Sequence, residues 1–265
     1  MLLVVNCVPN MLKFMRTKKG QFAYLTDIGK ERSTNEDFAI ALKNKSDDLL
    51  MIVCDGMGGY ARGDIAASVA IETLKEEFLK IDHFFNSSDV RRFLSRNIKK
   101  ANQKIYKLAH ENDLSSKMGT TITAAIIRKN TLFVVSIGDS RAYIVEDDIL
   151  RITDDDSYVN YLYRLNRISF EEMETHPKRH ILMSALGITP TINFDVSFYR
   201  HDNSRIFLCT DGLYTMVSEE KMYNILTLKK STEEKCQLLI NEANKNGGKD
   251  NIGLALWEVS SYERK

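Results

Sequence analysis

The sequence predicts an α+β fold, a four-layer α-β-β-α sandwich in which two mostly antiparallel sheets lie between two helix pairs. Short apolar runs of strand length alternate with pairs of amphipathic segments of helix length. The order is strands, a helix pair, more strands, a second helix pair and a final strand, and helices outside two stacked sheets bury all of these apolar faces. The chain has three prolines and no Gly/Ser-rich linker, so we expect one domain over residues 21–260.

The first half of the chain supplies strands and one helix pair. Residues 21–54 are predicted strands, and the last run, DLLMIVC, is continuously apolar, as in a strand covered on both faces. Residues 63–80 and 89–112 are predicted helices. In the second, apolar residues such as Phe93 and Ile98 recur at spacings of three and four. The two helices should therefore pack side by side on a sheet face.

Residues 119–153 are dense in β-branched residues and predict a strand meander. Residues 205–210 are a further strand, and residues 218–228 and 232–246 are predicted helices. Ser231 with Glu234 forms a capping-box pattern at the start of the second of these. The apolar run NIGLALWEV then predicts a final strand.

The segment between the meander and the next strand has a different character. It is polar, and its pattern is helical only near 156–166. A long excursion of this kind between strands is often functional, so we expect a flap at about 154–180. Its tyrosines, Tyr158, Tyr161 and Tyr163, either pack the flap down or touch a protein substrate.

Composition excludes several classes of partner. With 37 basic and 36 acidic residues the net charge is +1, which does not indicate binding to nucleic acid or an anionic membrane. Residues 1–20 are a leader of undetermined order, since their apolar run is too short to insert into a membrane and lacks a basic start. The four cysteines form no C-x-x-C pair, and Cys54 and Cys209 fit a core in a reducing cytoplasm.

Four acidic residues lie at the ends of four apolar runs that are far apart in the sequence: Asp55, Asp139, Asp211 and Asp250. Each alone is explained equally well as a turn residue. Four strand ends bring their acids together only if the sheets are arranged to do so, and the joint pattern therefore predicts one oxygen-rich pocket. Oxygen ligands suit hard divalent cations, so the sequence predicts Mg²⁺ or Mn²⁺.

The segment RSTNED precedes another apolar run and contains Arg32, Glu36 and Asp37. Arg32 is the cation of this segment. An arginine beside metal ions can bind phosphate through two parallel hydrogen bonds, which a lysine does less well. Taken alone, Arg32 and Glu36 fit a surface ion pair across a turn as well.

Two known designs of acid-rich or metal-holding site are disfavoured by the sequence. None of the five histidines lies in an acid motif, whereas dinuclear phosphatases of the calcineurin or purple-acid type need several histidine ligands. Phosphatases of the haloacid-dehalogenase type need D-x-D-x-T near a strand end, but Asp55 is followed by Gly56-Met57-Gly58.

The motifs as an ordered set are specific. They are R-S-T-N-E-D, D-G-M-G-G-x₃-G, G-T-T, G-D-S-R, S-A-L-G, T-D-G-L and D-N. Spread from Phe22 to Trp257, they resemble the metal-dependent Ser/Thr protein phosphatases of the type 2C (PPM) family. The segment from Thr153 to Gly187 is similar to the flap and post-flap region of the bacterial branch, whose members commonly oppose a membrane Ser/Thr kinase.

The resemblance implies roles for the first metal ligands. Asp55 would bridge two metal ions, and the backbone carbonyl of Gly56 would be a ligand. Asp211 and Asp250 would complete one metal site. With Arg32, which would hold the substrate phosphate, the three aspartates make up the catalytic set.

The resemblance also implies roles for the remaining acids, further from the first metal site. Glu36 would approach the second metal ion, often through water, with Asp37 as its neighbour in the outer shell. Asp139 with Asp211 would hold a third metal ion, as in many bacterial members. Animal members carry a histidine proposed as general acid where this chain has Met57, as bacterial members often do, so the acid for the leaving group stays open.

The predicted function is Mg²⁺/Mn²⁺-dependent hydrolysis of phosphoserine and phosphothreonine in proteins. The attacking group would be a water that bridges two metal ions ~3.5–4 Å apart, which lower its pKa toward ~7. Phosphomonoester hydrolysis is among the slowest uncatalysed reactions, with accelerations up to ~10²¹, and this route needs no side-chain nucleophile. We expect a cytoplasmic monomer that acts on phosphoproteins and opposes a cognate Ser/Thr kinase.

Two alternatives stay open at this point. One is a pseudophosphatase that binds a phosphoprotein or another partner without turnover. The other is a phosphatase of small phosphoesters, which would share the site and differ in the groove and the flap. Completeness of the acid set, with Asp55, Asp139, Asp211 and Asp250 all present, favours the enzyme over the pseudophosphatase.

Overall fold

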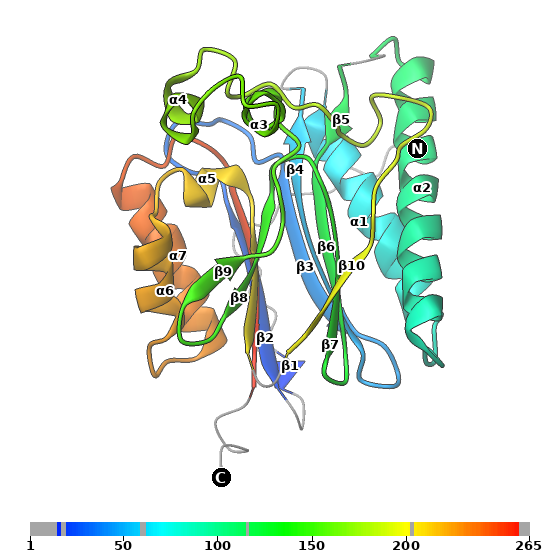
Figure 1. The fold of residues 1–265 in the computed structure, drawn as a ribbon. Coiled ribbons are helices and arrows are strands. Elements are labelled where there is room, and N and C mark those ends of the chain that lie inside the picture. Colours follow the sequence, from blue (N-terminus) through cyan, green and yellow to red (C-terminus); the bar gives the residue numbers. More distant parts are fainter. Residues whose placement is uncertain (1–14, 17–19, 59–61, 115–116, 202–203, 260–265) are drawn as a thin grey trace.

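Two stacked antiparallel sheets between helix pairs form the structure, as Figure 1 shows for a computed structural model of the chain. The structure describes residues 15–16, 20–58, 62–114, 117–201 and 204–259. One helix pair covers the outer face of each sheet. The predicted four-layer sandwich is therefore confirmed.

The first sheet has six strands in the order β1-β2-β12-β11-β8-β9, and every pairing in it is antiparallel. Its strands are β1 (Met15–Arg16), β2 (Gln21–Asp27), β8 (Arg141–Val145), β9 (Ile149–Arg151), β11 (Arg205–Cys209) and β12 (Ile252–Glu258). We call it sheet I.

The second sheet, sheet II, has the order β10-β7-β6-β4-β3, with β5 paired to the end of β4. Its pairings are antiparallel as well. Its strands are β3 (Asp37–Lys43), β4 (Leu49–Met57), β5 (Gly119–Thr120), β6 (Ile122–Arg128), β7 (Thr131–Ile137) and β10 (Ser197–Arg200).

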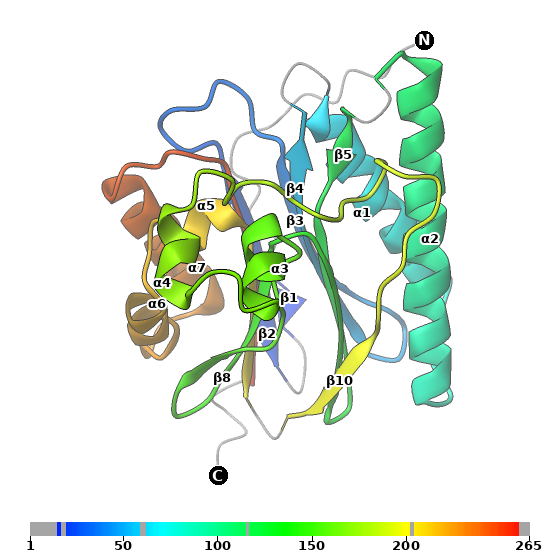
Figure 2. The ribbon, with the colours of Figure 1, turned by 45° about the horizontal axis from the view of Figure 1, so that its top comes forward.

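Helices form the outer layers. The pair α1 (Gly63–Leu79) and α2 (Ser87–Glu111) packs on sheet II. Sheet I is covered by α5 (Asp211–Tyr214), α6 (Glu219–Leu226) and α7 (Thr232–Lys245). The segment after β9 contains α3 (Tyr158–Arg164) and α4 (Phe170–Thr175), which lie over α5 at one end of the sandwich (Figure 2).

Alternating side chains explain why the central strands are continuously apolar. In β4, Ile52 and Cys54 pack against α1 and α2, while Met51 and Val53 pack into the layer between the sheets. Successive side chains of a strand point to opposite faces, and here both faces are buried. The run DLLMIVC therefore forms a strand that is covered on both sides, as predicted.

The structure differs from the sequence prediction in short elements. The edge strand β10 and the helices α4 and α5 were not expected. The run predicted as one strand from residue 119 is divided, because β5 pairs with Gly56 and Met57 before β6 continues along β4. Each missed element has six residues or fewer, which is too short to show a clear period.

Of the predicted leader, residues 1–14 and 17–19 lie outside the described part of the chain. Within the described residues, no helix is both long and apolar enough to cross a membrane.

A buried ion cluster fastens α7 to sheet I. The Lys235 ammonium, only 2% exposed, donates to Glu258 Oε2 at 2.6 Å, and Arg205 Nε donates to the same oxygen at 3.0 Å. Removal of one partner from a buried pair leaves a charge in a poorly solvated place, which is strongly destabilising.

We therefore expect Glu258→Gln to lower the free energy of unfolding by about 3–5 kcal/mol, measured by urea denaturation. The control is Glu72→Gln, which removes an exposed ion pair with Lys75 at 2.9 Å and should change stability by about 0.5 kcal/mol or less. Equal effects of the two substitutions would contradict this assignment.

Candidate active site

Five aspartates meet at one end of the sandwich. Asp37 begins β3 and pairs across the ladder with Asp55 in β4. Asp139 follows β7, Asp211 follows β11 and Asp250 precedes β12. Because β4, β7 and β11 run opposite to β3 and β12, all five positions fall at the same end of the strands, the end near which Figure 1 draws α3 and α4. The predicted convergence of strand ends is confirmed.

The five residues come from both sheets. Asp37 and Asp55 lie in strands of sheet II, and Asp139 lies in the link from β7 of sheet II to β8 of sheet I. Asp211 follows β11 and Asp250 precedes β12, both strands of sheet I. A hydrogen bond joins the two groups, since the Thr210 hydroxyl donates to Asp37 Oδ2 at 2.6 Å. The site therefore lies across the gap between the sheets.

Burial and mutual repulsion mark these carboxyl groups as close neighbours. Burial raises the pKa of Asp55 well above its usual value, and the charges of Asp37 and Asp211 raise it further. For Asp37, burial is again the largest cause, followed by Asp211 and Asp250 among the neighbouring charges. Burial and the charge of Asp211 raise the pKa of Asp139 to about 7. The group is electrostatically unfavourable without a compensating cation.

The donor set fits a hard divalent cation. Asp211 Oδ1 is buried and has no hydrogen-bond partner among the described residues, which is costly for a carboxylate oxygen. As the side chains stand, no three His, Cys, Asp or Glu residues of the described part form a group that could hold a metal ion. A cation among these carboxylates would offset their like charges. Clustered carboxylate oxygens are the ligands that Mg²⁺ and Mn²⁺ prefer.

Arg32 already interacts with this acid group. Its Nη2 donates to Asp250 Oδ2 at 2.7 Å, although the two residues are 218 positions apart. The arginine side chain is half exposed. Its predicted place beside the acids is confirmed, and its carboxylate partner is Asp250 rather than Glu36.

Asn251 fixes the loop that carries Arg32, a role that the sequence did not reveal. Its side-chain amide donates to the backbone carbonyls of Ile28 and Thr34, both at 2.9 Å. Its Oδ1 accepts from the Glu36 backbone N–H at 2.9 Å. One side chain thus holds both ends of the loop, and the D-N motif is the only sequence signal for it.

Two threonines of the G-T-T motif hold the backbone of Asp55. Thr121 Oγ1 accepts from the Asp55 N–H at 2.9 Å, and the Thr120 hydroxyl donates to the Asp55 carbonyl at 2.9 Å. Thr121 Oγ1 also lies 2.9 Å from Ser140 Oγ, the residue after Asp139. The motif therefore links two of the acid-bearing segments.

Glycines follow the acids where chain segments approach closely. A Cβ at Gly56 would collide with the backbone carbonyls of Gly63 and Glu36. A Cβ at Gly212 would collide with the carbonyl of Asn251. The D-G pairs thus allow the strand ends to pack against neighbouring backbone.

His180 lies near this group, which nothing in the sequence indicated. It is exposed and belongs to the segment that contains α3 and α4. Burial raises the pKa of Asp211, and a positive charge on His180 would lower it, which puts the imidazole in the electrostatic range of the acids.

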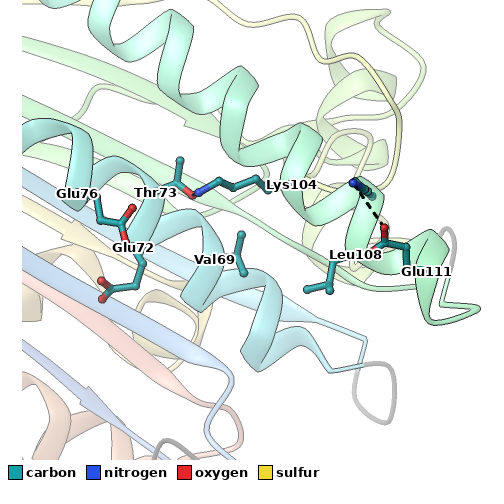
Figure 3. Close-up of a pocket in the computed structure, with 8 residues that line it drawn as sticks. Val69, Glu72, Thr73, Glu76, Lys104, Leu108 and Glu111 are labelled. Atoms are coloured by element: carbon teal, nitrogen blue, oxygen red, sulfur yellow. Dashed lines mark hydrogen bonds and ion pairs between the residues drawn. The ribbon is translucent and has the colours of Figure 1, made fainter. Parts of the chain in front are cut away.

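A pocket of about 360 Å³ lies elsewhere, between α1 and α2 (Figure 3). Its lining mixes acidic, basic and apolar side chains, and Lys104 reaches across it to donate to the Thr73 hydroxyl at 3.1 Å. None of the site aspartates lines it. It is a groove between packed helices, separate from the acid group.

Comparison with known proteins agrees with this geometry. A family model described as "Protein phosphatase 2C" matches residues 29–248. The serine/threonine phosphatase stp of Listeria welshimeri is 37% identical over 246 residues, which cover 91% of this chain and 96% of that protein.

Solved structures are similar as well. The serine/threonine phosphatase of S. agalactiae superposes with a TM-score of 0.86 at 34% identity, and covers 91% of this chain and 100% of that one. The catalytic domain of the serine threonine protein phosphatase PstP, solved in complex with 2 manganese ions, gives a TM-score of 0.79 at 29% identity over 92% of this chain and 99% of that one. The chain therefore belongs to the protein phosphatase 2C family.

Proposed function

We propose that this protein is a Mg²⁺/Mn²⁺-dependent phosphatase of phosphoserine and phosphothreonine in proteins. The observation that carries the proposal is the group of aspartates at the ends of strands from both sheets, with a buried, unpaired oxygen on Asp211 and with Arg32 beside it. Membership of the protein phosphatase 2C family supports it.

The residues that would hold the cations follow from their positions. Asp55 would share two cations with Asp211 and Asp250, whose charges act on it, and the Gly56 carbonyl would be a further ligand. Glu36 and Asp37 would act from the outer shell, which agrees with the hydrogen bond that Asp37 accepts from Thr210. Asp139 with Asp211 would hold a third cation.

The cations, when bound, would lower the pKa of water and offset the negative charge of a transferring phosphoryl group. The protein fixes where this happens. Thr120 and Thr121 orient the Asp55 backbone, and Asn251 holds Glu36 next to Asp250. Preorganised donors and acceptors of this kind need no rearrangement at the moment of reaction.

Arg32 is placed to bind the substrate phosphate. A guanidinium matches a phosphate through two parallel hydrogen bonds, and a half-exposed side chain can exchange its carboxylate partner for an incoming anion. Arg32 would then leave Asp250 as phosphate arrives, which releases that carboxylate for a cation.

Protein substrates are supported by the surface beside the acids. The segment with α3 and α4 exposes Tyr161, Tyr163, Leu165 and Phe170, with exposed fractions between 43% and 56%. Exposed apolar surface next to an active site is typical of a site that contacts protein. The alternative, a pseudophosphatase, has no observation in its favour, because the acid set is complete.

The cysteines bear on the compartment in which the protein would act. The three described cysteines, Cys54, Cys209 and Cys236, are free and buried, which suits the reducing cytoplasm. We propose that the protein acts there as a monomer on phosphoproteins and opposes a Ser/Thr kinase.

Asp211→Asn tests the assignment of ligands. We expect hydrolysis of p-nitrophenyl phosphate and of a phosphothreonine peptide with Mn²⁺ to fall by more than about 100-fold, the upper range for residues that support a metal ligand. Asp82→Asn, which changes an exposed acid paired with Lys45, is the control and should keep wild-type rates. Full activity of Asp211→Asn would refute the assignment.

The same substitution should stabilise the protein in EDTA. Replacement of one carboxylate by a neutral amide removes repulsion from Asp55 and Asp250, so we expect a melting temperature above that of the wild type. Mn²⁺ at 100 times its Kd should stabilise the wild type by about 2.7 kcal/mol and so raise its melting temperature. The rise in the melting temperature of Asp211→Asn should be far smaller. Equal Mn²⁺ shifts in the two proteins would contradict a metal site at Asp211.

A further inference from the structure

The S-A-L-G motif opens a segment that lies between β5 and α2. We call residues 184–190 the SALG segment, and Figures 1 and 2 draw this part of the chain in yellow-green as it passes β5 and reaches α2. Leu186 forms an antiparallel bridge with Thr120 of β5. The Thr120 N–H donates to the Leu186 carbonyl at 3.1 Å, and the Leu186 N–H donates to the Thr120 carbonyl at 2.9 Å. β5 is therefore held between the end of β4 on one side and the SALG segment on the other.

Asn102 attaches the SALG segment to α2. Its side chain is buried, with an exposed fraction of 1%. Its Oδ1 accepts from the Gly187 N–H at 2.8 Å, and its Nδ2 donates to the carbonyls of Thr189 at 3.0 Å and Pro190 at 3.4 Å. An amide that accepts from and donates to one short segment of backbone fixes both the position and the orientation of that segment.

Close packing restrains the SALG segment on two sides. Gly187 has a φ of 87°, and a Cβ there would collide with the Ile105 side chain of α2. A Cβ at Gly119 of β5 would collide with the Leu186 carbonyl and the Ile188 side chain. The segment can therefore move toward neither α2 nor β5.

β5 in turn holds the backbone that carries Asp55. The Thr120 hydroxyl and the Thr121 N–H both donate to the Asp55 carbonyl, each at 2.9 Å. Thr120 also lies opposite Gly56 in the ladder between β4 and β5. A continuous series of contacts thus runs from Asn102 through the SALG segment and Thr120 to the two residues that would supply a carboxylate and a carbonyl to the cations.

We propose that Asn102 is a positioning residue for the cation site at Asp55 and Gly56. The inference rests on the proposed function for the identity of that site. Metal ligands must be held within about 0.5 Å of their productive geometry by the groups around them. Loss of the Asn102 amide releases one side of β5, so the oxygens of Asp55 and Gly56 occupy a wider range of positions and the affinity for cations falls.

Asn97 provides a matched control on the same helix. Its side chain is also buried, with an exposed fraction of 4%, and its Nδ2 donates to the Phe93 carbonyl at 2.9 Å. That hydrogen bond lies within α2. Asn97→Ala therefore removes a buried amide and a hydrogen bond from α2 but leaves the attachment of the SALG segment in place.

Hydrogen exchange of the metal-free protein, followed for single amides by NMR, tests whether Asn102 holds β5. Rates are compared with those of amides in β12, which report opening of the whole fold. We expect Asn102→Ala to raise the relative rates of the Leu186, Thr120 and Thr121 amides by about tenfold or more, because loss of a buried hydrogen bond makes local opening easier. Asn97→Ala should leave these relative rates unchanged.

Calorimetric titration with Mn²⁺ tests whether this support reaches the cation site. The sites that include Asp55 are identified by their absence in Asp55→Asn. We expect Asn102→Ala to weaken them by about tenfold or more, the range for residues that orient metal ligands. Asn97→Ala should bind Mn²⁺ as the wild type does. A purely structural role would lower stability in both variants without separating their Mn²⁺ affinities at a temperature where both are folded.

Gly187→Ala tests the same route from the other partner. Its Cβ displaces the SALG segment from Ile105 while Asn102 stays in place. This variant should also raise the exchange rates at Thr120 and Thr121 and weaken Mn²⁺ binding, and it decides the question if Asn102→Ala does not fold.

Wild-type relative exchange at Thr120 and Thr121, or wild-type Mn²⁺ affinity, in folded Asn102→Ala would overturn the proposal. Equal changes in Asn97→Ala would overturn it as well. A failure of the proposed function gives a different result, because the wild type itself would then show no Mn²⁺ site that Asp55→Asn removes.

Discussion

Repulsion among neighbouring carboxylates is the constraint on which the rest of this structure depends. Asp37, Asp55, Asp139 and Asp211 are held together although burial and like charge both oppose their ionisation. Hydrogen bonds with Thr120, Thr121, Thr210 and Asn251 hold the backbones and side chains around them. The apolar layers on both faces of each sheet contribute the stability that offsets this repulsion.

Much of the fold could be predicted because its main signals are periodic. The four long helices begin and end within about two residues of the predicted positions, and β4 is covered on both faces, as its continuous apolar run indicated. β10 was not predicted because its residues, SFYR, lie at a sheet edge. Phe198 there is 57% exposed, and buried and exposed residues do not alternate along the strand. α4 has a capping box at Ser169 and Glu172, a signal that was present in the sequence but preceded only six helical residues.

The site was predictable in its members and less so in its connections. Acids at strand ends indicate convergence, because antiparallel strands place the end of one beside the start of the next. The partner of Arg32 was not predictable, since nothing local relates it to Asp250, more than two hundred residues away. The role of Asn251 depends on the same long-range placement. The D-N motif contains this residue, but only the folded backbone shows what it holds.

The division of the acids between two sheets has a consequence for the choice of cation. The distance across the site is set by how closely the sheets stack, and the layer between them contains the alanines Ala39, Ala142 and Ala255. Mg²⁺ demands near-ideal octahedral geometry at about 2.0–2.1 Å, whereas larger ions tolerate longer and less regular contacts. A bulkier side chain in that layer would widen the sandwich and favour ions of larger radius. Part of the selectivity for ionic size would then depend on alanine side chains that contact no ligand.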